Sequence, residues 1–183
     1  MNTKELTQAL ETLGWLSYVD DVGDRYAQFK MADRIVQIVY GIRDMKDSQQ
    51  LEVIRSLSTT PFSKACLEIC GNGQTYTPLI RAMKGVRVRE AVILEEHVCR
   101  VSEETIIWAE EQDLLAGLRA CAALSTDAPG ARPIWHLAAL VLSGDADKLK
   151  YYQASFEAGD RLGFVTYITK DYIDRAVSLL GRL

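Results

Sequence analysis

The feature that most constrains the fold is a change of hydrophobic period near Gly14. Before this residue, Leu6, Leu10 and Leu13 recur at the spacing of one face of a helix. After it, apolar and polar residues alternate as they do in β-strands. The alternating runs cover residues 15–19, 25–31, 34–42 and 51–59. Short polar connections separate the runs, so the first third of the chain predicts an amphipathic helix followed by an antiparallel β-meander.

Local signals define both ends of that first helix. Asn2 and Glu5 fit a capping box, which starts a helix near Thr3. Gly14 is expected just beyond its C-terminal end, where glycine adopts the left-handed conformation easily.

Beyond residue 60 helical signals dominate, apart from one extended segment. The expected elements are a helix over 61–69, a turn at Gly71-Asn72-Gly73, a helix over 77–83, an extended segment over 86–100 and a helix over 102–124. Pro61 suits the first turn of a helix, and Ser102 is a good N-cap that two glutamates follow. An alternative for the last element is a broken helix, in which Asp113 caps a second segment.

The clearest linker in the chain is the segment TDAPGAR over residues 126–132. After it we expect three helices: one over 134–142, one ending at Gly159 and one capped by Thr169. His136 lies inside the first of them and is expected to be a hydrogen-bonded core residue. The prediction is thus an α+β domain over residues 1–125 and a helical extension over 126–183 that packs on the same core.

Composition excludes several classes of function. The 21 basic and 25 acidic residues give a formal charge of −4, which argues against nonspecific binding to nucleic acid or anionic lipid. The N-terminus lacks the apolar core of a secretory signal peptide. No stretch approaches the roughly 18 apolar residues of a membrane span. We therefore expect a cytoplasmic protein.

The four cysteines point to packing rather than to metal binding. In the cytosol, Cys66, Cys70, Cys99 and Cys121 are expected to stay reduced and to pack as small hydrophobic residues. Cys66, Cys70 and Cys99 could join His97 as four zinc ligands, but the CxxC spacing of structural zinc sites is missing. We expect no metal, cofactor or disulfide.

The most unusual feature is an acidic segment, in which eight acids and a single lysine or arginine, Arg100, lie between residues 90 and 113. The acids are Glu90, Glu95, Glu96, Glu103, Glu104, Glu110, Glu111 and Asp113. A small basic cluster over residues 81–89 could pair with them, but it lacks the aromatic residues of a nucleic-acid site. We expect the segment to bind a basic protein partner. The residues expected to form this surface are Glu95, Glu96, Glu103, Glu104, Glu110 and Glu111.

Two alternatives assign catalytic chemistry to the same segment. On one continuous helix, Glu104 and Glu111 rotate onto the apolar side that carries Ile107. A carboxylate there must lie at the rim, pair with arginine, or act as a general acid or base. On an extended segment, His97 and Cys99 would share a face as base and nucleophile. Both remain open as alternatives to protein binding.

The opening ELTQALETLGWLSYVDDVGDRYAQFKMADRIVQIVYGI resembles the start of type III secretion chaperones, which begin with a helix and an antiparallel three-stranded meander. This resemblance covers about a quarter of the chain, ends near Thr60, and implies protein binding without catalytic residues. In its class, a small acidic cytosolic α+β protein, the chain is also similar to bacterial immunity proteins. We therefore expect foremost an immunity protein that neutralises a bacterial toxin by direct binding, and secondly a secretion or effector chaperone.

Overall fold

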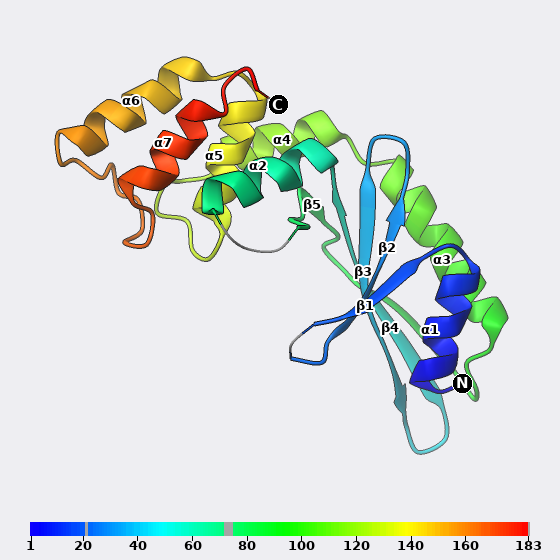
Figure 1. The fold of residues 1–183 in the computed structure, drawn as a ribbon. Helices are drawn as coiled ribbons and strands as arrows, with labels where there is room; N and C mark the ends of the chain where they lie inside the picture. Colours follow the sequence, from blue (N-terminus) through cyan, green and yellow to red (C-terminus); the bar gives the residue numbers. More distant parts are fainter. Residues whose placement is uncertain (21, 72–74, 183) are drawn as a thin grey trace. The chain divides into compact units, whose positions relative to one another are not determined.

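The computed structural model describes residues 1–20, 22–71 and 75–182 and has an α+β fold (Figure 1). Its elements are α1 (Thr3–Thr12), β1 (Leu16–Val19), β2 (Arg25–Lys30), β3 (Ile35–Asp44), β4 (Gln49–Ser58), α2 (Thr60–Cys70), β5 (Ile80–Arg81), β6 (Val86–Glu90), α3 (Glu95–Glu110), α4 (Leu114–Ala122), α5 (Arg132–Leu142), α6 (Ala146–Glu157) and α7 (Lys170–Ser178). The predicted order of N-terminal helix, antiparallel meander and C-terminal helices is confirmed. The expected turn at Gly71-Asn72-Gly73 falls largely outside the described residues.

The chain divides into two compact units. The sheet unit contains Met1–Leu57 and Ile80–Gln112, and the helical unit contains Ser58–Leu79 and Asp113–Leu183. This division differs from the boundary near residue 125 that the linker suggested. The reason is that α2 packs against α5 and α7, and α4 packs against α5, so both earlier helices belong with the C-terminal ones.

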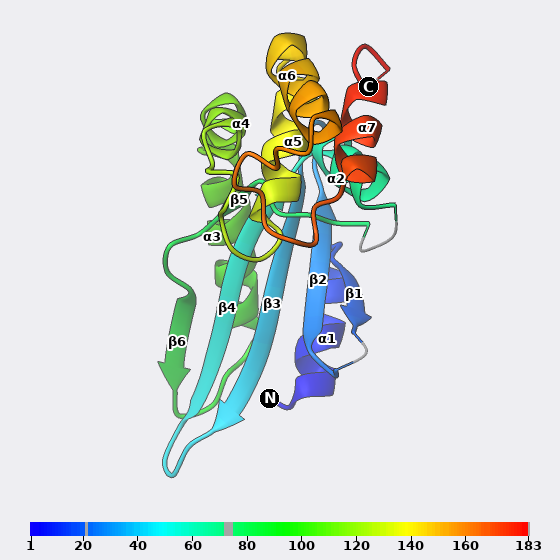
Figure 2. The same ribbon diagram turned by 90° about the vertical axis from the view of Figure 1, so that its left-hand side faces the viewer.

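The sheet has the order β1-β2-β3-β4, and β4 pairs with both of the remaining strands (Figure 2). Tyr18 lies opposite Tyr26 between β1 and β2, and Phe29 lies opposite Val36 between β2 and β3. β6 pairs with residues 49–53 of β4, and β5 pairs with residues 56–57. The expected helix over 77–83 is therefore wrong, because this segment supplies a short strand that pairs with β4.

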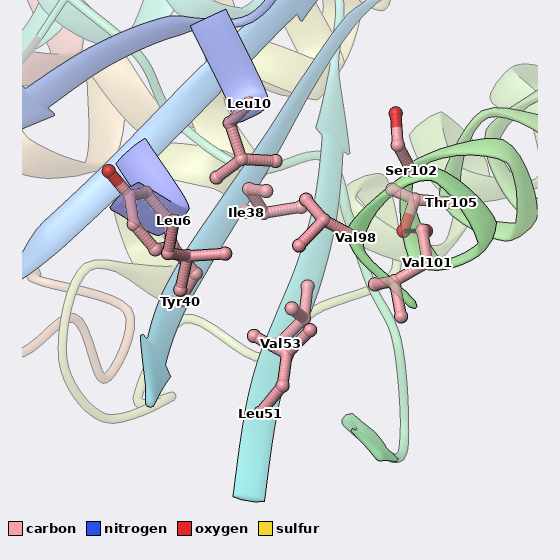
Figure 3. A pocket seen from close by; sticks show the side chains of 10 residues that line it. All are labelled: Leu6, Leu10, Ile38, Tyr40, Leu51, Val53, Val98, Val101, Ser102 and Thr105. Carbon is pink, nitrogen blue, oxygen red and sulfur yellow. Dashed lines mark hydrogen bonds between the residues drawn. The ribbon is translucent and has the colours of Figure 1, made fainter. Parts of the chain in front are cut away.

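One face of the sheet is buried beneath α1 and α3 (Figures 2 and 3). The side chains that meet there are Leu6, Leu10, Ile38, Tyr40, Leu51, Val53, Val98, Val101, Ser102 and Thr105. They enclose a void of about 10 Å³, which is at the lower limit for holding one water molecule. Leu6 and Leu10 are buried as the stripe predicted, whereas Leu13 is only half-buried at the C-cap of α1.

α3 begins earlier than expected, and this corrects two predictions. The extended segment over 86–100 is wrong beyond Glu90, because β6 ends there and α3 starts at Glu95. Its first turn is capped by His97, whose Nδ1 accepts a hydrogen bond from the Leu94 backbone N–H at 2.9 Å. Ser102 is therefore no N-cap: it lies buried within the helix, where its hydroxyl accepts the indole N–H of Trp15 at 2.8 Å.

The break between α3 and α4 agrees with the alternative of a broken helix. α3 ends at Glu110, and Asp113 is the N-cap of α4, where its carboxylate accepts the Ala116 N–H at 3.0 Å.

In the helical unit, Thr59 caps α2 by accepting the Phe62 N–H at 3.2 Å, with Pro61 in the first turn. Within the described ranges, no helix is long and apolar enough to cross a membrane.

His136 is a hydrogen-bonded core residue of the helical unit, as predicted. It is fully buried in α5, with its Nε2 3.0 Å from the Tyr152 hydroxyl on α6. Its Nδ1 lies 3.4 Å from the Cys121 carbonyl oxygen in α4. One imidazole thus connects three helices, and burial lowers the pKa of His136 below its ordinary value of 6.5.

We expect the stability of the helical unit to fall in mild acid because of this histidine. Its folded-state pKa is lowered, so its contribution is fully present above pH 6.5. As the pH falls below that value towards the folded-state pKa, the unfolded chain takes up the proton first and stability is lost. Urea unfolding from about pH 8 to 5.5 should show the loss, and His136→Gln should flatten it. His97→Gln, which changes the other histidine, should keep it, whereas a flat wild-type profile would contradict the prediction.

Candidate functional site

All six glutamates expected to form a binding surface are exposed and lie along α3 or at its C-cap. We call this set the acidic face: Glu95, Glu96, Glu103, Glu104, Glu110 and Glu111. The buried residues of α3 are Val98, Val101, Ser102, Thr105 and Ala109. Because residues of a helix advance by about 100°, these small and β-branched residues form one stripe and turn the glutamates towards solvent.

Most of the acidic face has no ion-pair partner among the residues that the structure describes. Glu96 lies 3.8 Å from the Nε2 atom of His97, and in the described part of the chain the other five carboxylates make no salt bridge. The two arginines of β6, which belong to the basic cluster over 81–89, make their contacts with residues outside the acidic face. Arg87 pairs with Glu52 at 2.8 Å, and Arg89 donates to the Ser48 hydroxyl at 2.9 Å.

Arg55 is a cation that contacts the backbone of Glu104. Its guanidinium lies 5.1 Å from the centre of the Trp108 ring and donates to the Glu104 backbone carbonyl at 3.4 Å. Burial lowers the pKa of Arg55, and the Glu104 carboxylate opposes that shift. This arginine packs beside the acidic face, and within the described chain it makes no ion pair with a glutamate of that face.

Ile107 lies on the acidic face and not in the core, which corrects the expectation that its side of the helix is buried. Its side chain is 53% exposed. Glu104 and Glu111 do rotate towards Ile107, but all three face solvent. The conflict that raised a catalytic role for the two carboxylates is therefore absent. They lie about 10 Å apart along the helix axis, since each residue rises 1.5 Å.

Arg34 holds the end of α3 that carries Glu110 and Glu111. Its side chain is 15% exposed and donates to the carbonyl oxygens of Ala109, Glu110 and Gln112, the last two at 3.3 and 3.4 Å. A cation at a helix C-terminus also interacts favourably with the negative end of the helix dipole. The arginine comes from the turn before β3, and no local sequence signal connects it with α3.

The proposed pair of His97 and Cys99 is wrong, because both residues lie on a helix and not on a strand. Two positions apart on a helix, they point about 200° away from each other. His97 is engaged at the helix start, whereas Cys99 lines a groove of about 230 Å³ between α1 and α3, together with Glu5 and Glu95. Nucleophile and base therefore do not meet.

The conceivable zinc ligands are divided between the two units. Cys66 and Cys70 belong to the helical unit, whereas His97 and Cys99 belong to the sheet unit. Among the described residues, no group of three or more His, Cys, Asp or Glu side chains is placed to hold a metal. Burial raises the pKa of Cys66 to about 12 and that of Cys121 to about 11, so both thiols are protonated at neutral pH.

Fold and surface together define an α+β protein whose most distinctive exposed feature is a largely unpaired acidic helix face. The chain belongs to a family of unknown function, DUF6990, whose model matches residues 2–181. No curated protein and no solved structure matches the chain. The family match spans both units.

Proposed function

We propose that this protein binds a basic protein partner through the acidic face of α3 and neutralises it, as an immunity protein neutralises a toxin. The observation that carries the proposal is the presence of six exposed carboxylates on one helix, five of them without an ion pair in the described chain. Two carboxylates about 6 Å apart in water repel each other by about 0.7 kcal/mol. A basic partner removes this repulsion on binding. The negative electrostatic field of the six carboxylates also raises the rate at which the two proteins associate.

A secretion chaperone is the second candidate, favoured by the order α1-β1-β2-β3 at the start of the sheet unit. The two functions differ in what happens to the partner. An immunity protein abolishes the activity of a folded toxin at stoichiometric ratio, whereas a chaperone keeps its partner ready for export. Titrating the activity of a partner that has been identified by pull-down and mass spectrometry separates the two.

We expect charge reversal of the acidic face to slow association with that partner. The variant changes Glu95, Glu96, Glu103 and Glu110 to lysine, and all four side chains are exposed, so the fold should persist. Electrostatic steering raises association rates by about tenfold or more at low salt, so the variant should lose that factor and show a flatter salt dependence. Stopped-flow association measured across a salt series tests this expectation.

A control variant separates the face from net charge. It reverses four exposed acids outside α3, namely Glu11, Asp47, Asp147 and Asp171, so both variants carry the same formal charge. The control should lose less of the association rate than the α3 variant. Equal rates and equal salt slopes for wild type and the α3 variant would refute the proposal.

A further inference from the structure

Ile107 is the apolar centre of a ring of carboxylates. Its side chain is 53% exposed, and its four nearest neighbours on the helix surface, at i−4, i−3, i+3 and i+4, are Glu103, Glu104, Glu110 and Glu111. All four are exposed and make no salt bridge within the described residues. Protein interfaces commonly have an apolar centre surrounded by a polar rim, and most of the binding free energy arises at that centre. Ile107 and its four glutamates have this arrangement.

We infer that the partner docks on this ring with a cationic amphipathic helix, one apolar side chain of which packs against Ile107 while flanking Lys or Arg side chains meet the four glutamates. This inference rests on the proposed function and specifies the chemistry of the partner. Charge complementarity sets the sign of the flanking residues, because all four residues at i±3 and i±4 from Ile107 are acidic. A neutral or acidic segment would leave the carboxylates desolvated without partners.

The geometry of the ring selects a helix over an extended strand. Ile107 has neighbours on four sides, so the facing surface must place positive charges on four sides of one apolar residue. A helix does this with residues at i±3 and i±4, which lie about 5–6 Å from the central position. A strand offers same-face neighbours in one line only, about 7 Å before and after the central residue.

The ring is held in place before any partner binds. Arg34 donates to the carbonyl oxygens of Ala109, Glu110 and Gln112, which fixes the last turn of α3. On the buried side of the same helix, Ser102 accepts the indole N–H of Trp15 at 2.8 Å. A surface ordered in advance loses less conformational freedom on binding, which favours affinity.

The probe is a pair of labelled 18-residue peptides of identical Lys and Leu composition. In the first, the leucines form one helical stripe flanked by lysines; in the second, they are distributed around the helix. Fluorescence anisotropy with the full chain should show tighter, salt-dependent binding of the first peptide. Ile107→Ser should weaken it at least tenfold. Ile54→Ser should not, although Ile54 is 52% exposed and lies on β4. Circular dichroism verifies the fold of both variants.

The outcomes separate this inference from the proposed function. If Ile107→Ser binds the first peptide like wild type while the charge reversal of the acidic face abolishes binding, the acidic surface stands and the apolar centre is overturned. Equal binding of the two peptides overturns the helical docking mode. If neither peptide binds, the inference and the proposed function fail together. The same holds if Ile107→Ser and the charge reversal of the acidic face both bind the first peptide like wild type. Loss of binding with Ile107→Ser and with the charge reversal, but not with Ile54→Ser, supports the inference.

Discussion

Truncating Leu10 to alanine is expected to lower the free energy of unfolding of the sheet unit by about 2–5 kcal/mol. Leu10 is 3% exposed and projects from α1 into the core that α3 and the sheet enclose (Figure 3). The void already there is only about 10 Å³, so the deleted atoms leave a new cavity in a tightly packed region. Urea unfolding followed by circular dichroism, with amide exchange of β3 to report on this unit, measures the loss.

The matched control for that variant is Leu16→Ala. Leu16 is 51% exposed on β1, so its truncation should cost less than about 1 kcal/mol. A cost below about 1 kcal/mol for Leu10→Ala as well would contradict the packing of α1 on the sheet.

Replacing Trp15 with alanine should have a still larger effect, about 3–5 kcal/mol. The indole is 1% exposed, its ring lies 5.4 Å from that of Phe29, and its N–H donates to Ser102. Trp15→Phe keeps most of the packing and loses the hydrogen bond, so it should cost about 1–2 kcal/mol. Ser102→Ala should cost a similar amount, because it leaves the buried indole N–H unsatisfied. Equal stability of Trp15→Ala and Trp15→Phe in urea would show that the side chain contributes little packing.

The first helix could be predicted because its determinants are close together in the sequence. The Asn2 side chain accepts the Lys4 and Glu5 N–H groups, and the Glu5 carboxylate accepts the Asn2 N–H at 2.8 Å. All three bonds span three residues or fewer, so residue types and spacing suffice to predict them. The alternating runs likewise predicted the meander, because a period of two reports which residues share a face of a strand.

The start of α3 could not be predicted in the same way. None of the residues that favour N-caps precedes it: Leu94 occupies the cap position, and His97 supplies the hydrogen bond. The stripe of Val98, Val101 and Thr105 is β-branched, which favours strands when read locally. Packing of this stripe against the sheet overrides that preference, and packing is a property of residues distant in the sequence.

Sequence alone therefore determined the α+β class, the sign of the charge on one segment and the eight acids that carry it, among them the six glutamates of the acidic face. Only the tertiary structure decided that these glutamates share the solvent side of one helix, that Ile107 lies exposed among them, and that Arg34 clamps the helix end. The physical reason is that periodicity shows which residues share a face of one element, whereas burial depends on what packs against that face. For α3 the partners are α1, the sheet and an arginine 75 positions away from Ala109 in the chain.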